Sequence, residues 1–153
     1  MLKTYTVFSI RDEFAKRYFY KSDILFRFLK DAPEADNKAI KKQFDYITNS
    51  FTTSDIVSRL SDINEASLRV NDAENELTIE ATDYTIYISV FDKYLTFTCD
   101  QTYQTEELLY NTLRNICPYI FIINRKREGH YGWVSPLQQN LRYKSGQLLY
   151  SFF

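Results

Sequence analysis

Residues 4–20 read Thr4-Tyr-Thr-Val-Phe-Ser-Ile-Arg-Asp-Glu-Phe-Ala-Lys-Arg-Tyr-Phe-Tyr20, a strand pattern that continues directly into a helix pattern. Residues 4–10 carry apolar side chains on both faces of the expected strand, which is typical of a central strand. Asp12 and Glu13 then place acidic side chains in the first turn of a short helix, where the helix dipole favours them. We therefore expect the N-terminus to enter the middle of a sheet and to continue into a helix that covers it.

This first helix has more apolar side chains than one core contact needs. At about 100° per residue, Phe14 and Tyr18 lie one turn apart, and Ala15 and Phe19 form the neighbouring row. The two rows make a stripe about 140° wide. We expect Ala15 and Phe19 to face the core, whereas periodicity alone leaves open whether Phe14 and Tyr18 are buried or exposed.

Two further helices are predicted at about residues 23–31, with Ser22 as N-cap, and 37–49. The first of them carries a stripe of four apolar residues that we expect in the core, Ile24, Leu25, Phe28 and Leu29. The next places Ile40, Phe44 and Ile47 on one side, with Gln43 and Tyr46 at its flank. Thr53 or Ser54 is expected to cap a shorter helix that carries Ile56, Val57, Leu60 and Ile63.

From about residue 67 the pattern changes to alternation by twos. Residues 77–82, 85–91 and 95–99 alternate apolar with polar side chains, and Asp92-Lys93 makes a short turn, as in antiparallel hairpins. A helix is predicted over residues 105–117, which Pro118 prevents from continuing, and an apolar strand follows at 119–123. The predicted fold class is therefore α+β. We expect a single domain over residues 1–153, a mainly antiparallel sheet of about five strands packed against helices, and room for an extra hairpin in the tail, 138–153.

Length and composition are those of one globular domain with its own core, at 153 residues, 44% apolar and 25% charged. A net charge of −1 argues against a general nucleic-acid or membrane-surface binder, since both need a basic field. We expect Cys99 and Cys117 to be free thiols. The N-terminus has no signal-peptide run and no stretch is long enough for a membrane span, so we expect a cytoplasmic protein.

Catalytic motifs are missing from the sequence. The chain has only three glycines, so it has no glycine-rich loop that approaches a phosphate. His130 is the sole histidine, which removes metal sites built on a histidine pair, and no serine lies in a G-x-S-x-G pattern. We expect no enzyme activity, no cofactor and no metal site.

The compact basic run Arg125-Lys-Arg127 supports an alternative function, that of a small nucleic-acid-associated protein. Aromatic residues for base stacking follow closely at Tyr131 and Trp133, although Trp133 is more simply expected in the core. Three charges are few for counterion-driven binding in a slightly acidic chain, and a solvated loop explains the run equally well. In a mobility-shift assay titrated with salt, steep salt dependence of binding to bare DNA or RNA would favour the nucleic-acid function.

Four segments together resemble the SirA family, sporulation inhibitors of replication from endospore-forming bacteria. They are Tyr5–Phe19, Phe44–Thr48, Leu108–Pro118 and His130-Tyr-Gly-Trp-Val-Ser-Pro136, and the likeness extends over most of residues 3–137. The resemblance implies a non-enzymatic protein that binds the N-terminal domain of the replication initiator DnaA, as a monomer or in a 1:1 complex. Such a protein blocks new rounds of chromosome replication as cells commit to sporulation.

The resemblance also implies which residues contact the partner. The family's interaction surface falls on Phe14 and Tyr18 of the first helix and on Pro136 of the C-terminal motif, with Gln43 and Tyr46 of the third helix as further candidates. Aromatic side chains at such positions supply rigid contact area at a small entropic cost. A proline at position 136 would hold its loop in a single shape, since its φ is fixed.

Overall fold

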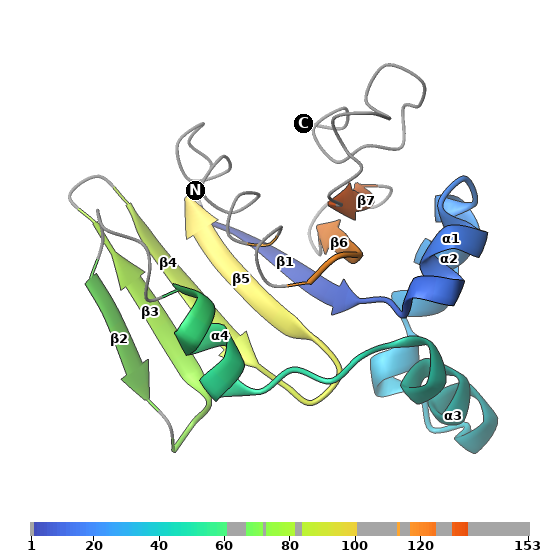
Figure 1. The fold of residues 1–153 in the computed structure, drawn as a ribbon, viewed down its shortest axis with the longest axis horizontal. Coiled ribbons are helices and arrows are strands. Elements are labelled where there is room, and N and C mark those ends of the chain that lie inside the picture. The colour runs from blue at the N-terminus through green and yellow to red at the C-terminus, as the bar shows by residue number, and fades with distance from the viewer. Residues whose placement is uncertain are drawn as a thin grey trace.

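The fold is that of a computed structural model, which describes residues 2–60, 67–71, 73–81, 84–100, 113, 117–124 and 130–134. These residues form one seven-stranded sheet and four α-helices, shown in Figure 1. The strands are β1 (Leu2–Ser9), β2 (Ser67–Asn71), β3 (Glu76–Glu80), β4 (Thr85–Val90), β5 (Leu95–Asp100), β6 (Ile120–Asn124) and β7 (Tyr131–Val134). The helices are α1 (Asp12–Tyr18), α2 (Ser22–Leu29), α3 (Lys38–Ile47) and α4 (Thr53–Leu60), with a 3-10 turn at Ala32–Glu34.

The sheet has the order β2-β3-β4-β5-β1-β6-β7, and each neighbouring pair is antiparallel. The α+β class is confirmed, as is the antiparallel sheet. The expected number of about five strands was too low, because β2 has only two apolar residues and β7 is four residues long and contains a glycine, so neither was predicted as a strand. The Asp92-Lys93 turn is confirmed: Val90 pairs with Leu95 across it.

Strand β1 lies inside the sheet, as its two apolar faces predicted. It pairs with β5 on one side, where Tyr5 faces Phe97, and with β6 on the other, where Val7 faces Ile122. Because side chains alternate across a strand, Tyr5 and Val7 point to one face of the sheet and Phe8 to the other. The two faces carry separate buried clusters.

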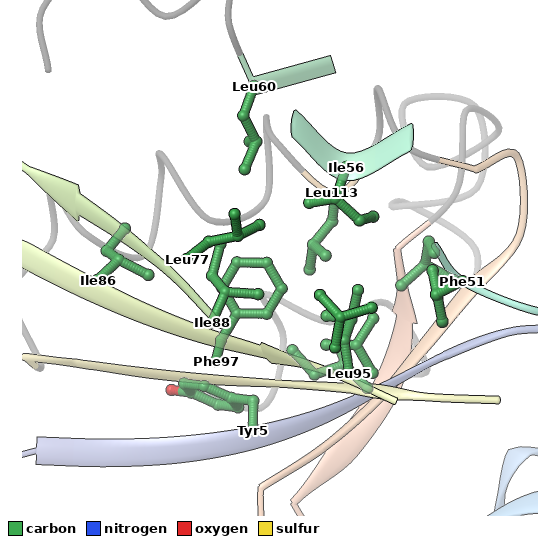
Figure 2. Close-up of a cluster of buried hydrophobic side chains, with 14 of the residues drawn as sticks. Tyr5, Phe51, Ile56, Leu60, Leu77, Ile86, Ile88, Leu95, Phe97 and Leu113 are labelled. Atoms are coloured by element: carbon green, nitrogen blue, oxygen red, sulfur yellow. The ribbon is translucent and has the colours of Figure 1, made fainter. Parts of the chain in front are cut away.

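The first cluster covers the face formed mainly by β3, β4 and β5. Figure 2 shows Leu77, Ile88 and Phe97 from these strands below Ile56 of α4 and Leu113. Leu113 is helical and fully buried, Cys117 at the end of the predicted helix lies outside any helix, and the other residues of that helix lie outside the described residues.

The second cluster covers the opposite face at the β1-β6-β7 side, where Figure 1 shows α1, α2 and α3 gathered. Its centre is Trp133, which is 0% exposed, stacks on Phe19 with ring centroids 5.7 Å apart and meets Phe121 edge-on. Ala15 is also fully buried in this cluster. The predicted core positions of Ala15, Phe19 and Trp133 are confirmed.

Two predicted helix caps are corrected. Ser22 is the first residue of α2, and the carbonyl oxygen of Lys21 accepts the first helical bonds from Ile24 and Leu25. Helix α4 is capped by Thr52, because the Asp55 amide donates to its hydroxyl oxygen at 3.3 Å, instead of by Thr53 or Ser54.

Three predictions concern residues that the structure does not describe. These are Pro136 of the proposed partner surface, the basic run 125–127 and the hairpin tail 138–153. Both cysteines are free thiols as expected, with Cys99 buried and Cys117 half-buried. In the part of the chain that is described, no helix is long and apolar enough to cross a membrane.

Candidate partner-binding surface

A pocket of about 360 Å³ lies between α1, α2 and α3, on the outer side of the second cluster. We call it the helix pocket, and its lining residues are Phe14, Tyr18, Ile24, Leu25, Phe28, Gln43, Tyr46 and Ile47. Each helix contributes residues spaced by three or four positions, which is the spacing of one helical face. The pocket is therefore built by the three helices together.

Four of the five residues that the resemblance implies for partner contact line this one pocket. Phe14 and Tyr18 come from α1, and Gln43 and Tyr46 come from α3. Phe14 and Tyr18 are half-buried, because one side of each packs against the second cluster while the other lines the pocket. Periodicity left open whether Phe14 and Tyr18 are buried or exposed, and in the structure both side chains are partly buried. The fifth residue, Pro136, lies outside the described residues.

Tyr46 is held at the rim of the helix pocket by two contacts. The Phe14 and Tyr46 rings meet edge-to-face with centroids 5.3 Å apart, and the Arg11 guanidinium carbon lies 5.4 Å from the centroid of the Tyr46 ring. Tyr46 nevertheless remains 58% exposed. Its ring is thus held in place and still accessible to a partner.

A short backbone ladder fixes the distance between α1 and α3. The Arg11 amide donates to the Ile47 carbonyl oxygen at 2.9 Å, and the Asn49 amide donates to the Ser9 carbonyl oxygen at 2.8 Å. Ile10 and Thr48 form an isolated bridge between these two bonds. Because the ladder joins the start of α1 to the end of α3, the two walls of the pocket are positioned by backbone hydrogen bonds.

Helix α3 is also secured at both ends. Its N-cap is Asn37, whose side-chain oxygen accepts from the amides of Ala39 at 2.8 Å and Ile40 at 3.4 Å. At the C-terminal end, the Lys93 ammonium donates to the carbonyl oxygens of Asp45 and Thr48 at 3.2 and 3.3 Å. These contacts stabilise the wall that carries Gln43 and Tyr46.

The stripe of α2 was predicted to be core, and this was wrong for Ile24. Leu25 is 3% exposed and faces the second cluster, whereas Ile24 is 48% exposed and Phe28 is half-buried, and both line the helix pocket. Ile40 of α3 is likewise exposed, at 36%. The sequence did contain a sign that part of the α2 stripe is exposed, because this stripe is as wide as that of α1 and exceeds what one core contact needs.

A second hollow of about 600 Å³ lies beside the backbone ladder, lined by Ile10, Arg11, Asp12, Asn49, Pro118 and Tyr119. The Asp12 carboxylate forms an ion pair with Lys16 at 3.1 Å. The hydrogen bond and charge of Asp12 raise the pKa of Lys16, and burial, followed by a hydrogen bond to Asp12, raises the pKa of Tyr119. The charge of Asp12 is thus balanced by Lys16.

The helix pocket has few polar groups. His130, the sole imidazole of the chain, lines neither of the two hollows. Among the residues placed by the structure, no group of three or more His, Cys, Asp and Glu side chains is arranged to hold a metal ion. The helix pocket is apolar apart from one amide and two phenols, a composition that suits contact with another protein.

Comparison with protein families gives one match, over residues 3–138, to the family described as sporulation inhibitor of replication protein SirA. The chain belongs to the SirA family. The resemblance noted from the sequence is thereby confirmed, and the match includes every residue of the helix pocket. A comparison with curated protein sequences gives no significant match. SirA proteins are named as inhibitors of replication in sporulation, which is a regulatory function.

Proposed function

We propose that this SirA protein inhibits initiation of chromosome replication by binding the N-terminal domain of DnaA through the helix pocket. Phe14, Tyr18, Gln43 and Tyr46 supply the contacts, joined by Pro136. The observation that carries the proposal is the grouping of the first four residues. They come from two helices separated in sequence, and they line one pocket in a chain of the SirA family.

The pocket suits a protruding apolar side chain of a folded partner. The rings of Phe14 and Tyr46 contact each other, and the backbone ladder holds the two helices that bear them. A surface that is ordered before binding loses little conformational entropy when the complex forms. Gln43 is exposed at the wall and has an amide available to hydrogen-bond a partner backbone group.

Inhibition would follow from occupancy alone. A protein seated on the N-terminal domain of DnaA competes with any contact that the same surface makes, either with other DnaA molecules or with helper proteins at the origin. No chemical step is required of the inhibitor.

The test is formation of a complex between the purified chain and the isolated N-terminal domain of DnaA. We expect the mixture to co-elute from a sizing column at micromolar concentrations. Tyr18→Ala is expected to weaken binding by about 1 kcal/mol or more, about fivefold in Kd, and Gln43→Ala to weaken it in the same direction.

The matched control is Tyr87→Ala. Tyr87 is 50% exposed on β4, in the part of the sheet remote from α1–α3 in Figure 1. It should bind like the unmodified chain, and circular dichroism of each variant verifies folding. Absence of co-elution, or equal affinity of the Tyr18 and Tyr87 variants, would contradict the proposal.

A further inference from the structure

We infer that the partner surface which fills the helix pocket is acidic around an apolar anchor. The inference rests on the proposed function and adds the chemistry of the partner. It is drawn from four cations around the pocket, Arg11, Arg17, Lys21 and Lys42, which we call the rim cations.

The anchor must be apolar because the pocket is. Every lining residue except Gln43 is aromatic or aliphatic. Ile24 and Tyr46 are both close to half exposed, so the apolar surface continues from the pocket onto its rim. Covering these two side chains with an apolar group removes that surface from water, which favours binding.

Helical spacing places the rim cations beside the lining residues. Lys42 lies one turn before Tyr46 on α3, and Arg17 lies next to Tyr18 on the outer side of α1. Lys21 stands at the corner between α1 and α2, where its amide donates to the Tyr18 carbonyl oxygen at 2.9 Å. Arg11 lies over the ring of Tyr46.

The rim cations are exposed and have no carboxylate partner within the described ranges. Two other cations of α1 and α2 do have carboxylate partners. Lys16 is paired with Asp12 at 3.1 Å, and Arg27 with Asp23 at 3.7 Å. The four rim cations are therefore not neutralised by an ion pair with any described residue.

The carboxylates close to the pocket do not cancel this charge. Glu13 lies one turn before Arg17, Asp31 follows the end of α2, and Asp45 lies three residues after Lys42 on α3, so the four rim cations are opposed by three carboxylates. A positive rim around an apolar pocket is complementary to acidic side chains that flank an apolar anchor. A nucleic acid would leave the apolar pocket unfilled.

Two neighbouring lysines provide the test. Lys42→Glu reverses a rim cation, and Lys41→Glu makes the same change on a face of α3 that points away from the pocket. We expect Lys42→Glu to lower the association rate with full-length DnaA about fivefold at about 0.05 M salt, with Lys41→Glu within about twofold of the unmodified chain. The difference should shrink at about 0.5 M salt, where screening shortens the reach of the charges.

Lys42→Gln should give an intermediate rate, and both lysines are exposed, so the variants keep the fold. Equal effects at Lys41 and Lys42, or a loss that is unchanged by salt, would overturn the inference. The inference would also be overturned if the chain bound bare DNA in a mobility-shift assay and Lys42→Glu, but not Lys41→Glu, abolished that binding. The rim cations would then bind a nucleic acid. Tyr18→Ala distinguishes failure of this inference from failure of the proposed function. If Tyr18→Ala still weakens binding to DnaA while the lysine variants behave alike, the proposed function is supported and only the acidic character of the partner surface is contradicted.

Discussion

Single side chains at the helix pocket belong both to the core and to the surface. Phe14 contacts the second cluster on one side and Tyr46 on the other, while its neighbour Ala15 is fully buried. A half-buried aromatic residue is stabilised by the core and still offers one edge to a partner. Substitutions at Phe14 will therefore change stability and binding together, whereas those at exposed Gln43 report on binding alone.

The thiol of Cys117 provides a test at the same scale. Burial raises the pKa of Cys117 more than its hydrogen bond with Ser9 lowers it. Because the thiolate is the reactive form, we expect iodoacetamide to modify Cys117 more slowly in the native chain than in the denatured chain near pH 8.5, the ordinary range of a cysteine pKa. Peptide mass spectrometry measures the rate at this position, with Cys117→Ser as the blank.

The raised pKa also has a consequence for stability. Because the folded state favours the protonated thiol, Cys117 contributes to the free energy of unfolding. This contribution is complete below the pKa of the cysteine in the unfolded chain, and it is lost as the pH rises through the higher pKa of the folded state. Alkylation of Cys117 at equal rates in native and denatured protein would show that the thiol is not protected.

At the scale of elements, α1 and α2 are too short to be stable as isolated helices. They have 7 and 8 residues, about two turns each, and helices of this length in water depend on tertiary packing. Ala15 and Phe19 supply it for α1, and Leu25 and Leu29 for α2. Phe26 adds a stacked contact with Tyr131 of β7 at 4.3 Å.

Helix α3 is expected to depend on its N-cap. Asn37→Ala removes the acceptor for the Ala39 amide, and we expect it to lower the free energy of unfolding by about 1 kcal/mol. The neighbouring exposed substitution Asp36→Ala should stay within about 0.5 kcal/mol of the unmodified chain. Urea denaturation measures both. Equal losses in the two variants would mean that the cap contributes nothing specific.

At the scale of the whole molecule, the two clusters share one sheet. Strand β1 contributes Val7 to the first cluster and Phe8 to the second, and β6 contributes Ile122 and Phe121 in the same way. Loss of either cluster therefore exposes strands that the other requires. We expect the two clusters to unfold together.

The single tryptophan makes this testable, because Trp133 reports only on the second cluster. Ile88→Ala lies in the first cluster and should lower the free energy of unfolding by about 2–5 kcal/mol. In urea, we expect the transition from Trp133 fluorescence to coincide with that from circular dichroism and to move with it in the variant. A fluorescence midpoint that stays in place while the dichroism midpoint moves would show independent units.

By itself, the sequence determined the class of the fold and the position of its first strand. Alternation by twos predicted β3, β4 and β5, apolar faces on both sides predicted that β1 is internal, and the spacing of Ala15 and Phe19 predicted their burial. These are local patterns, because each depends on residues within one element. The resemblance supplied the candidate contact residues.

Only the tertiary structure decided the strand order and the shape of the helix pocket. The walls of the pocket are set by hydrogen bonds between residues 9–11 and residues 47–49, and no local period records such a pairing. For the same reason Ile24 was predicted in the core. Periodicity measures how apolar one face of a helix is, whereas exposure depends on whether a neighbouring element covers that face. In this protein α2 buries Leu25 and Leu29 in the core and leaves Ile24 beside the pocket.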